Sequence, residues 1–81
     1  MDLLLKNIDK IHTTLLGDKR IKKNLKLENN IDSVKFCKEI IQNKNANITL
    51  LGKNYYCLYK YKNIKIVINS YSYTIITAHI I

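Results

Sequence analysis

The chain contains two histidines, His12 and His79, and their side chains set the first chemical hypothesis. Cleavage of RNA through its own 2′-hydroxyl needs a general base, a general acid and a cation beside the phosphate. Imidazoles suit both proton-transfer roles at neutral pH. Arg20 or Lys53 can neutralise the phosphate, while Thr77 and Tyr73 can donate hydrogen bonds. This hypothesis requires the two rings to lie roughly 5–8 Å apart on an open surface.

A metal-independent endoribonuclease would therefore use His12, His79, Arg20 and Thr77 as its catalytic set. The competing interpretation is structural. His12 would end an apolar helix face and bond a helix terminus or loop, and His79 would belong to a strand.

Other enzymatic chemistries have little support in the sequence. No acidic residue lies beyond position 39, so the second half cannot supply the paired carboxylates that two-metal hydrolysis needs. The two cysteines and two histidines lack the spacing of a zinc site. Two glycines are too few for a glycine-rich phosphate loop. We therefore expect no metal and no cofactor.

Charge favours a binding function. Fourteen Lys and Arg residues against six Asp and Glu give a formal net charge of +8, and the lysines continue where the acids stop. A field of this sign attracts polyanions and speeds their encounter with the protein. The expected partner is RNA or a ribonucleoprotein complex; surface lysines that only maintain solubility, or that meet an acidic protein patch, are the alternatives.

The binding surface is expected to combine cations with tyrosine rings, because aromatic faces stack on bases while ammonium groups hold phosphates. Tyrosines are also good strand formers with half-buried rings, which is the structural alternative. The predicted nucleic-acid or partner-binding residues are Lys19, Arg20, Lys22, Lys23, Lys53, Tyr55, Tyr59, Lys60, Tyr61 and Lys62.

These side chains must be positioned by helices in the first half of the chain. Leu4, Leu5, Ile8, Ile11, His12 and Leu15 have the spacing of one helix face, which Asp2 can cap. Thr13 and Thr14 mark a break, and a second helix is expected over residues 18–25. A third helix should start at Asp32 or Ser33 and bury the stripe Val34, Cys37, Ile40 and Ile41.

Beyond residue 46 the hydrophobic period changes to two, which predicts strands at 47–51, 54–61, 63–70 and 73–80. Their short links predict an antiparallel meander. The expected class is α+β, with two or three helices packed on a four-stranded sheet in a single domain over residues 1–81. In the last strand, Thr74, Ile76, Ala78 and Ile80 form the better core face, which leaves His79 accessible. An exposed edge strand is a possible homodimer contact.

Composition also indicates the compartment. Cys37 and Cys57 share no motif, and a secreted scaffold of this size would carry more cysteines, so both are expected to be reduced and buried. The start "MDLLLKNIDK" is neither a signal peptide nor a membrane span. We expect a cytoplasmic protein with no membrane partner.

Three segments carry a resemblance to a known family: "KNIDKIHTTLLGDKRIKKNL", "GKNYYC" and "INSYSYTIITAH". In these segments the chain resembles an uncharacterised family of short bacterial proteins, a domain of unknown function found mainly in low-GC bacteria and their mobile elements. The resemblance implies no activity, but it draws attention to His12, Thr13, Arg20, Lys53, Asn54, Asn69, Tyr73, Thr74, Thr77 and His79.

Small size, positive charge, the lack of a strong catalytic set and the link to mobile elements together favour a non-enzymatic protein that binds RNA or an RNA-guided nuclease. Its most concrete form is a mobile-element-encoded inhibitor of a CRISPR nuclease. The histidine-dependent ribonuclease is the alternative.

Overall fold

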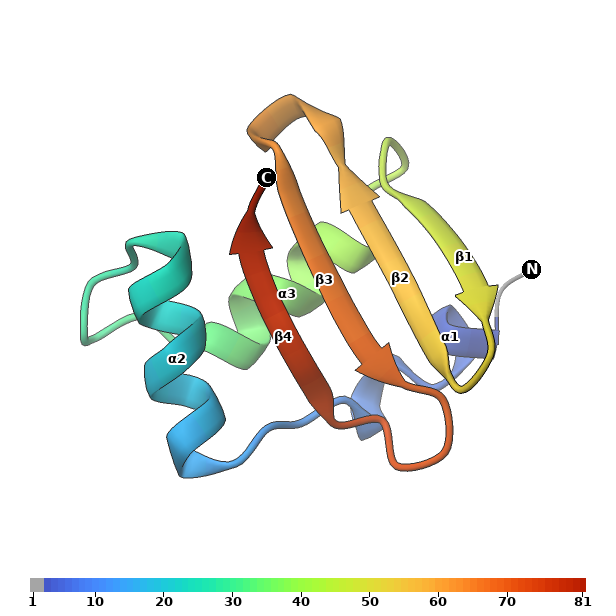
Figure 1. Cartoon of the computed structure of the whole chain (residues 1–81), viewed down its shortest axis with the longest axis horizontal. Helices are drawn as coiled ribbons and strands as arrows, with labels where there is room; N and C mark the ends of the chain where they lie inside the picture. The colour runs from blue at the N-terminus through green and yellow to red at the C-terminus, as the bar shows by residue number, and fades with distance from the viewer. Residues whose placement is uncertain (1–2) are drawn as a thin grey trace.

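Helices precede strands throughout the computed structural model of the chain, which describes residues 3–81. The helical part comprises α1 (Leu3–Lys6), the 3₁₀ turn η1 (Ile8–Lys10), α2 (Leu15–Leu25) and α3 (Ser33–Ile41). The sheet comprises β1 (Asn47–Leu51), β2 (Asn54–Tyr59), β3 (Ile64–Asn69) and β4 (Ile75–Ile80), with the 3₁₀ turn η2 (Lys60–Lys62) between β2 and β3. The predicted α+β class, with helices followed by a four-stranded antiparallel sheet, is confirmed (Figure 1).

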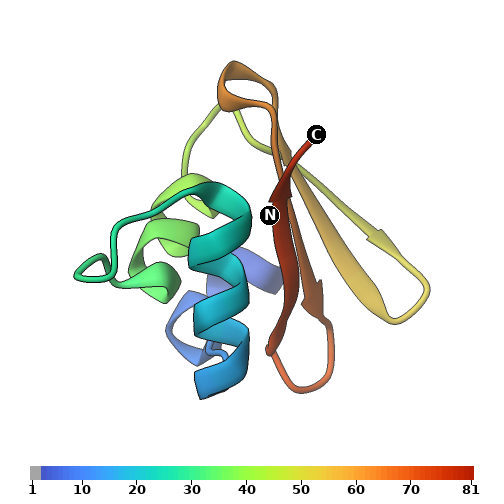
Figure 2. The same cartoon turned by 60° about the vertical axis from the view of Figure 1, so that its left-hand side comes forward.

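The strands lie in the sheet in chain order, β1-β2-β3-β4, as a meander. Gly52, with φ of 63°, occupies the left-handed region in the tight turn between β1 and β2, where a side chain would strain the backbone. Within residues 3–81, all helices lie on one side of the sheet, and no helix covers the opposite side (Figure 2). The core therefore fills a single layer between helices and sheet.

The first helix is shorter than the sequence pattern predicts. α1 ends at Lys6, and Ile11 is extended, so the expected stripe from Leu4 to Leu15 does not form. Leu4 and Ile11 are buried, whereas Leu15 is 77% exposed. The Thr14 hydroxyl accepts a hydrogen bond from the Gly17 amide and caps α2, which separates the two helices at the predicted break. Asp2, the expected cap of the first helix, lies outside the described residues.

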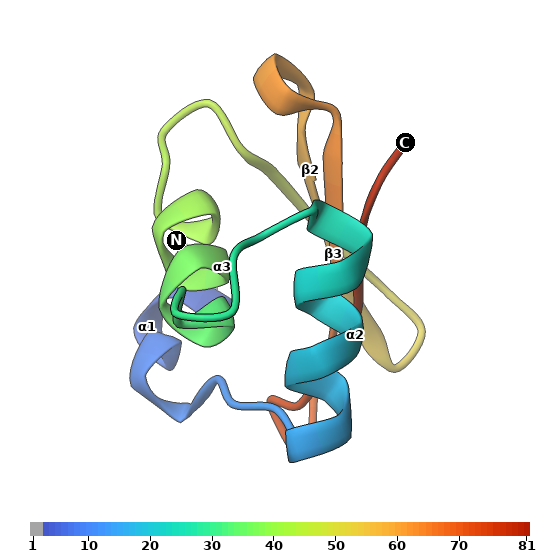
Figure 3. The ribbon, with the colours of Figure 1, turned by 90° about the vertical axis from the view of Figure 1, so that its left-hand side faces the viewer.

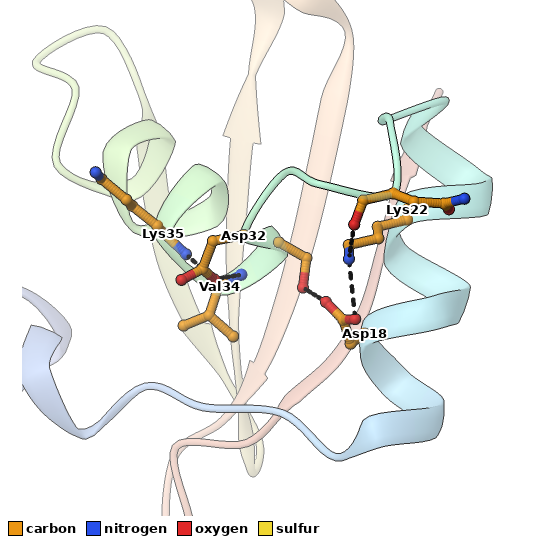
Figure 4. A network of polar contacts seen from close by, with 7 residues as sticks. Asp18, Lys22, Asp32, Val34 and Lys35 are labelled. Atoms are coloured by element: carbon orange, nitrogen blue, oxygen red, sulfur yellow. Dashed lines mark hydrogen bonds and ion pairs between the residues drawn. The ribbon is translucent and has the colours of Figure 1, made fainter.

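Helices α2 and α3 agree with the sequence pattern. Ile21 and Leu25 are buried on α2, while Cys37, Ile40 and Ile41 are buried on α3 and Val34 packs against the core at its edge. The Asp32 carboxylate caps α3 by accepting hydrogen bonds from the amides of Val34 and Lys35, 3.1 Å each (Figure 4). The two helices are positioned as the predicted buried faces require.

A polar network joins the two helices. The buried Ser33 hydroxyl, at the start of α3, donates a hydrogen bond to the Asp18 carboxylate on α2. The same carboxylate lies 3.3 Å from Lys22 Nζ, and that ammonium also donates to the backbone carbonyl of Asn29 at 2.8 Å (Figure 4). The connection fixes α2 relative to α3, and Figure 3 shows the two helices side by side over the sheet.

Both cysteines belong to the core, as predicted. Cys37 on α3 and Cys57 on β2 are free thiols with no exposed surface. Burial raises the pKa of the Cys37 thiol to about 12, with a further contribution from nearby Cys57, and raises the pKa of Cys57 to about 11. Thiols in this state are unreactive at neutral pH, because the thiolate is the nucleophile.

The prediction for the core face of β4 is correct at Ala78 but wrong at Ile75 and Ile76, because the strand contains a bulge. Ile68 pairs with Ile75 and Val67 pairs with Thr77, which leaves Ile76 as the extra residue. The bulge shifts the alternation, so Ile75 and Ala78 both face the helices and are buried. Ile76 and Ile80, which were expected in the core, are 53% and 47% exposed.

Candidate nucleic-acid interface

The structure does not bring the two histidines together. His12 lies beside the start of β4, where its amide donates to the Tyr73 carbonyl at 3.1 Å and its carbonyl accepts from the Ile75 amide at 2.8 Å. His79 lies near the other end of β4, opposite Lys65 on β3. His79 lies five residues beyond Thr74 along the chain, which corresponds to about 16 Å of extended strand. This separation exceeds the distance that the ribonuclease hypothesis requires.

The His12 ring belongs to a chain of hydrogen bonds. Its Nδ1 lies 2.9 Å from the Lys10 carbonyl, which can only accept, so Nδ1 carries the proton. In the neutral ring Nε2 is then the acceptor, and it lies 3.1 Å from the Thr74 hydroxyl. Thr74 in turn accepts from the Ser72 hydroxyl at 2.9 Å. The ring therefore anchors the segment before α2 to the loop before β4.

Parts of all three segments that carry the family resemblance meet at this corner of the sheet. The Asn69 side chain accepts hydrogen bonds from the amides of Tyr71 and Ser72, and the Ser70 amide donates to the Lys53 carbonyl at 2.8 Å. Tyr73 has φ of 60°, which is unusual for a bulky residue and is held by these backbone contacts. The corner positions the start of β4 against the N-terminus of α2.

A groove of about 440 Å³ runs from this corner between α2 and the free edge of β4. We call it the α2–β4 groove. Polar side chains line it from both elements, and Leu16 and Ile76 add apolar surface, 57% and 53% exposed. No carboxylate is among its lining residues. The polar side chains of the groove are Thr14, Arg20, Asn24, Thr74 and Thr77.

Helix α2 carries the densest group of cations. Between residues 18 and 26 there are five cations and one carboxylate. Lys22 is engaged by Asp18 and Asn29, whereas Lys19 and Lys23 are exposed. Arg20 lies in the groove itself. Four of the predicted binding residues thus lie on α2. One of them, Arg20, lines the groove together with Thr77, which was predicted only as part of the alternative catalytic set.

The other predicted cations lie elsewhere. Lys53 is in the turn before β2, and Lys60 and Lys62 are in η2 after it. The six residues of β2 that separate them span about 20 Å. Lys53 therefore lies at the opposite end of β2 from Lys60 and Lys62, and these predicted binding residues do not form one cluster.

Most of the predicted tyrosines point inward. Tyr55 is 4% exposed within the core. Tyr59 is half-buried, and its hydroxyl accepts a weak hydrogen bond from Asn43 at 3.4 Å. Only Tyr61, 74% exposed, presents its ring to solvent as expected. The ring on the uncovered side of the sheet is Tyr56, opposite Val67, and alternation from buried Cys57 would have identified it.

Within the described residues, no three side chains of the metal-binding types gather in one place. In the same part of the chain, no helix has the length and apolar character to cross a membrane. No curated protein and no solved structure is significantly similar to the chain. Residues 5–79 match the family described as Protein of unknown function (DUF3781), and the chain belongs to that family.

Proposed function

We propose that this protein is a non-enzymatic binding protein that engages RNA, either free or within a ribonucleoprotein, through the α2–β4 groove and the cations of α2. The observation that carries the proposal is the composition of the groove. Arg20 lies between hydroxyl and amide side chains, and no carboxylate lines the groove to repel a phosphate.

The side chains of the groove match the parts of a single RNA strand. A guanidinium recognises phosphate oxygens, and the hydroxyls of Thr14, Thr74 and Thr77 can bond phosphate or sugar oxygens. Leu16 and Ile76 offer apolar contact to a ribose or base. Lys19 and Lys23 on the same helix extend the positive potential beyond the groove.

The ribonuclease alternative has no comparable support. The separation of His12 from His79 leaves neither ring with a second proton-transfer group of its own type. Both ring nitrogens of His12 already form hydrogen bonds, to the Lys10 carbonyl and the Thr74 hydroxyl, which gives the ring a structural role. His12 is better described as a positioning residue for the groove.

The biological setting is part of the same proposal. We propose that this small basic protein acts in the cytoplasm, is encoded by a mobile element, and has an RNA-guided nuclease of the CRISPR type as its most concrete target. By occupying guide or target RNA it would inhibit that nuclease. Self-association through the exposed edge of β1 remains a separate prediction.

The test is RNA binding measured as a function of salt. Fluorescence anisotropy with a labelled single-stranded RNA should give a log Kd that rises linearly with log salt, with a slope of about 0.7 per phosphate engaged. The combined variant Lys19→Gln, Arg20→Gln, Lys23→Gln should lower that slope by about two and weaken binding at least tenfold.

The matched control removes the same charge from the other helix. Lys35→Gln, Lys38→Gln, Lys44→Gln changes α3 and the loop after it, which do not line the groove. It should keep most of the affinity and slope. Equal losses in the two variants, or no affinity for RNA in the unmodified protein, would refute the proposed interface.

A further inference from the structure

The uncovered side of the sheet is a second surface, distinct from the α2–β4 groove. Strand register places alternate residues on it: Thr49 and Leu51 of β1, Tyr56 and Leu58 of β2, Lys65 and Val67 of β3, and His79 of β4. The helices lie on the other side (Figure 2). We call these seven residues the open face; Thr77, at the edge of the sheet, lines the α2–β4 groove and is not counted with them.

The open face is hollowed and mostly apolar. A depression of about 610 Å³ crosses β1, β2 and β3, and Leu51, Tyr56, Leu58 and Ile81 contribute apolar surface to it. Leu51 and Ile81 are 68% and 58% exposed. Val67 is only 7% exposed although it lies outside the helix-side core. Its cross-strand partners are Tyr56 on β2 and Thr77 on β4.

The charge of this surface has one sign. Lys65 lines the depression, with its ammonium 5.3 Å from the centre of the Tyr56 ring, and it has no ion pair within residues 3–81. Its neighbour across the strands is His79. No acidic residue occurs after position 39, so no acidic side chain of the sheet offsets this cation. An apolar surface with an unpaired central cation is complementary to an apolar ligand that carries carboxylates.

The dimensions favour a helix as that ligand. Three adjacent strands span about 10 Å between the outer two, which is close to the diameter of an α-helix. A second copy of this chain would bring another Lys65 and a further charge of the same sign against the first. RNA is less suited to this surface, because the depression is mostly apolar and contains a single cation, whereas the α2–β4 groove contains Arg20 and several hydroxyls.

We propose that the open face binds an acidic amphipathic helix of a partner protein, with apolar side chains in the depression and a carboxylate paired with Lys65. With RNA in the groove, the chain would then connect a nucleic acid to a protein through two separate surfaces. The inference stands on the open face alone and does not require the groove to bind RNA.

The probe is a synthetic 18-residue peptide of Leu and Glu residues with helical amphipathic spacing. Titration into the ¹⁵N-labelled full chain should shift the amide signals of Tyr56, Lys65 and Leu51. The same peptide with Gln in place of Glu should bind at least tenfold more weakly. Equal affinity of the two peptides would overturn the role assigned to charge.

Two variants and one control locate the contact. Lys65→Glu and, separately, Leu51→Asp should each weaken binding of the acidic peptide at least tenfold. Lys35→Glu makes the same charge change as Lys65→Glu, but on α3, and should leave the affinity within about twofold. Circular dichroism checks that each variant folds, and Leu51, being largely exposed, provides the test if Lys65→Glu does not.

The remaining outcomes are equally decisive. Equal losses in Lys65→Glu and Lys35→Glu, or peptide-induced shifts confined to α2, would overturn the proposal. A dimer that is detected by sedimentation and whose contacts include Tyr56 and Leu58 would also overturn the proposal. The same holds if RNA, in place of the peptide, shifts the open-face signals. RNA affinity lost only in the α2 variants would leave this proposal intact, so the two failures are distinguishable.

Discussion

Single residues determine where the groove begins, and His12 is the most consequential of them. Its backbone bonds Tyr73 and Ile75, and its ring bonds Lys10 and Thr74, so one residue joins the segment before α2 to the edge of the sheet. Gly17 contributes by having no side chain, because a Cβ there would lie 2.2 Å from the Thr13 hydroxyl. The corner depends on close contacts between residues distant in the sequence.

The ring of His12 and the hydroxyl of Thr74 should be energetically coupled. We expect His12→Ala and Thr74→Val each to lower the free energy of unfolding by about 1 kcal/mol, since each removes hydrogen bonds at a partly exposed site. The double variant should lose less than the sum, with a coupling energy of about 0.5–1 kcal/mol. Urea unfolding measures all three, and additive losses would show that the bond contributes nothing.

At this scale the sequence predicted some residues and not others. The burial of Cys37 and Cys57 was predicted correctly from composition and periodicity. The prediction succeeded because a regular helix and a regular strand keep the spacing of their buried residues. The face of Ile76 was predicted wrongly, because a bulge inserts one residue and reverses the alternation beyond it. A bulge of this kind depends on pairing with β3, which the sequence of β4 alone does not show.

Among the elements, α2 contributes most to the proposed RNA interface, because it supplies one wall of the groove and most of the clustered charge. It is held to α3 by the Ser33–Asp18 hydrogen bond and the neighbouring Lys22 ammonium. The Ser33 bond and, to a smaller extent, Lys22 hold the pKa of the Asp18 carboxyl below its ordinary value of 3.8, against the opposing effect of desolvation.

This connection predicts a pH-dependent loss of stability that Asp18→Asn removes. A carboxyl whose pKa is lowered by folding stabilises the fold above its unfolded pKa, and that stability is lost as the pH falls through the folded pKa. The unmodified protein should therefore lose more free energy of unfolding between pH 5 and pH 3 than Asp18→Asn, as measured by urea unfolding.

The control is Asp9→Asn, which removes an exposed carboxylate of η1. It should retain the full pH dependence of the unmodified protein. If Asp18→Asn shows the same acid dependence as Asp9→Asn, the Asp18–Ser33 bond does not determine the relative placement of α2 and α3.

Elements were predictable where their signals were local. Asp32 capping, the stripes of α2 and α3 and the four strands could be recognised from spacing and turn residues. The first helix was not, because the apolar spacing from Leu4 to Leu15 fits a helix equally well. The alternative, pairing of His12 with Thr74, involves residues 62 positions apart, and only the tertiary fold makes that pairing available.

At the scale of the whole molecule, cations occur in both layers, whereas every acidic side chain comes from the half of the chain before the sheet. The sheet contains lysines without carboxylates, and the acids lie among the helices, as the sequence indicated. The sequence could not show that the uncovered side of the sheet has a mostly apolar depression. Two candidate surfaces of different character result: a polar, cationic groove at one edge and an apolar depression with one cation.

The most direct test of the RNA interface is a titration of the ¹⁵N-labelled protein with single-stranded RNA at physiological salt. We predict that the largest amide shifts occur at Gly17, Arg20, Asn24, Thr74 and Thr77, around the α2–β4 groove. Tyr56 and Lys65 on the open face should remain unshifted. Shifts spread evenly over the lysines, centred on the open face, or absent altogether would contradict the assignment of the groove as the RNA interface.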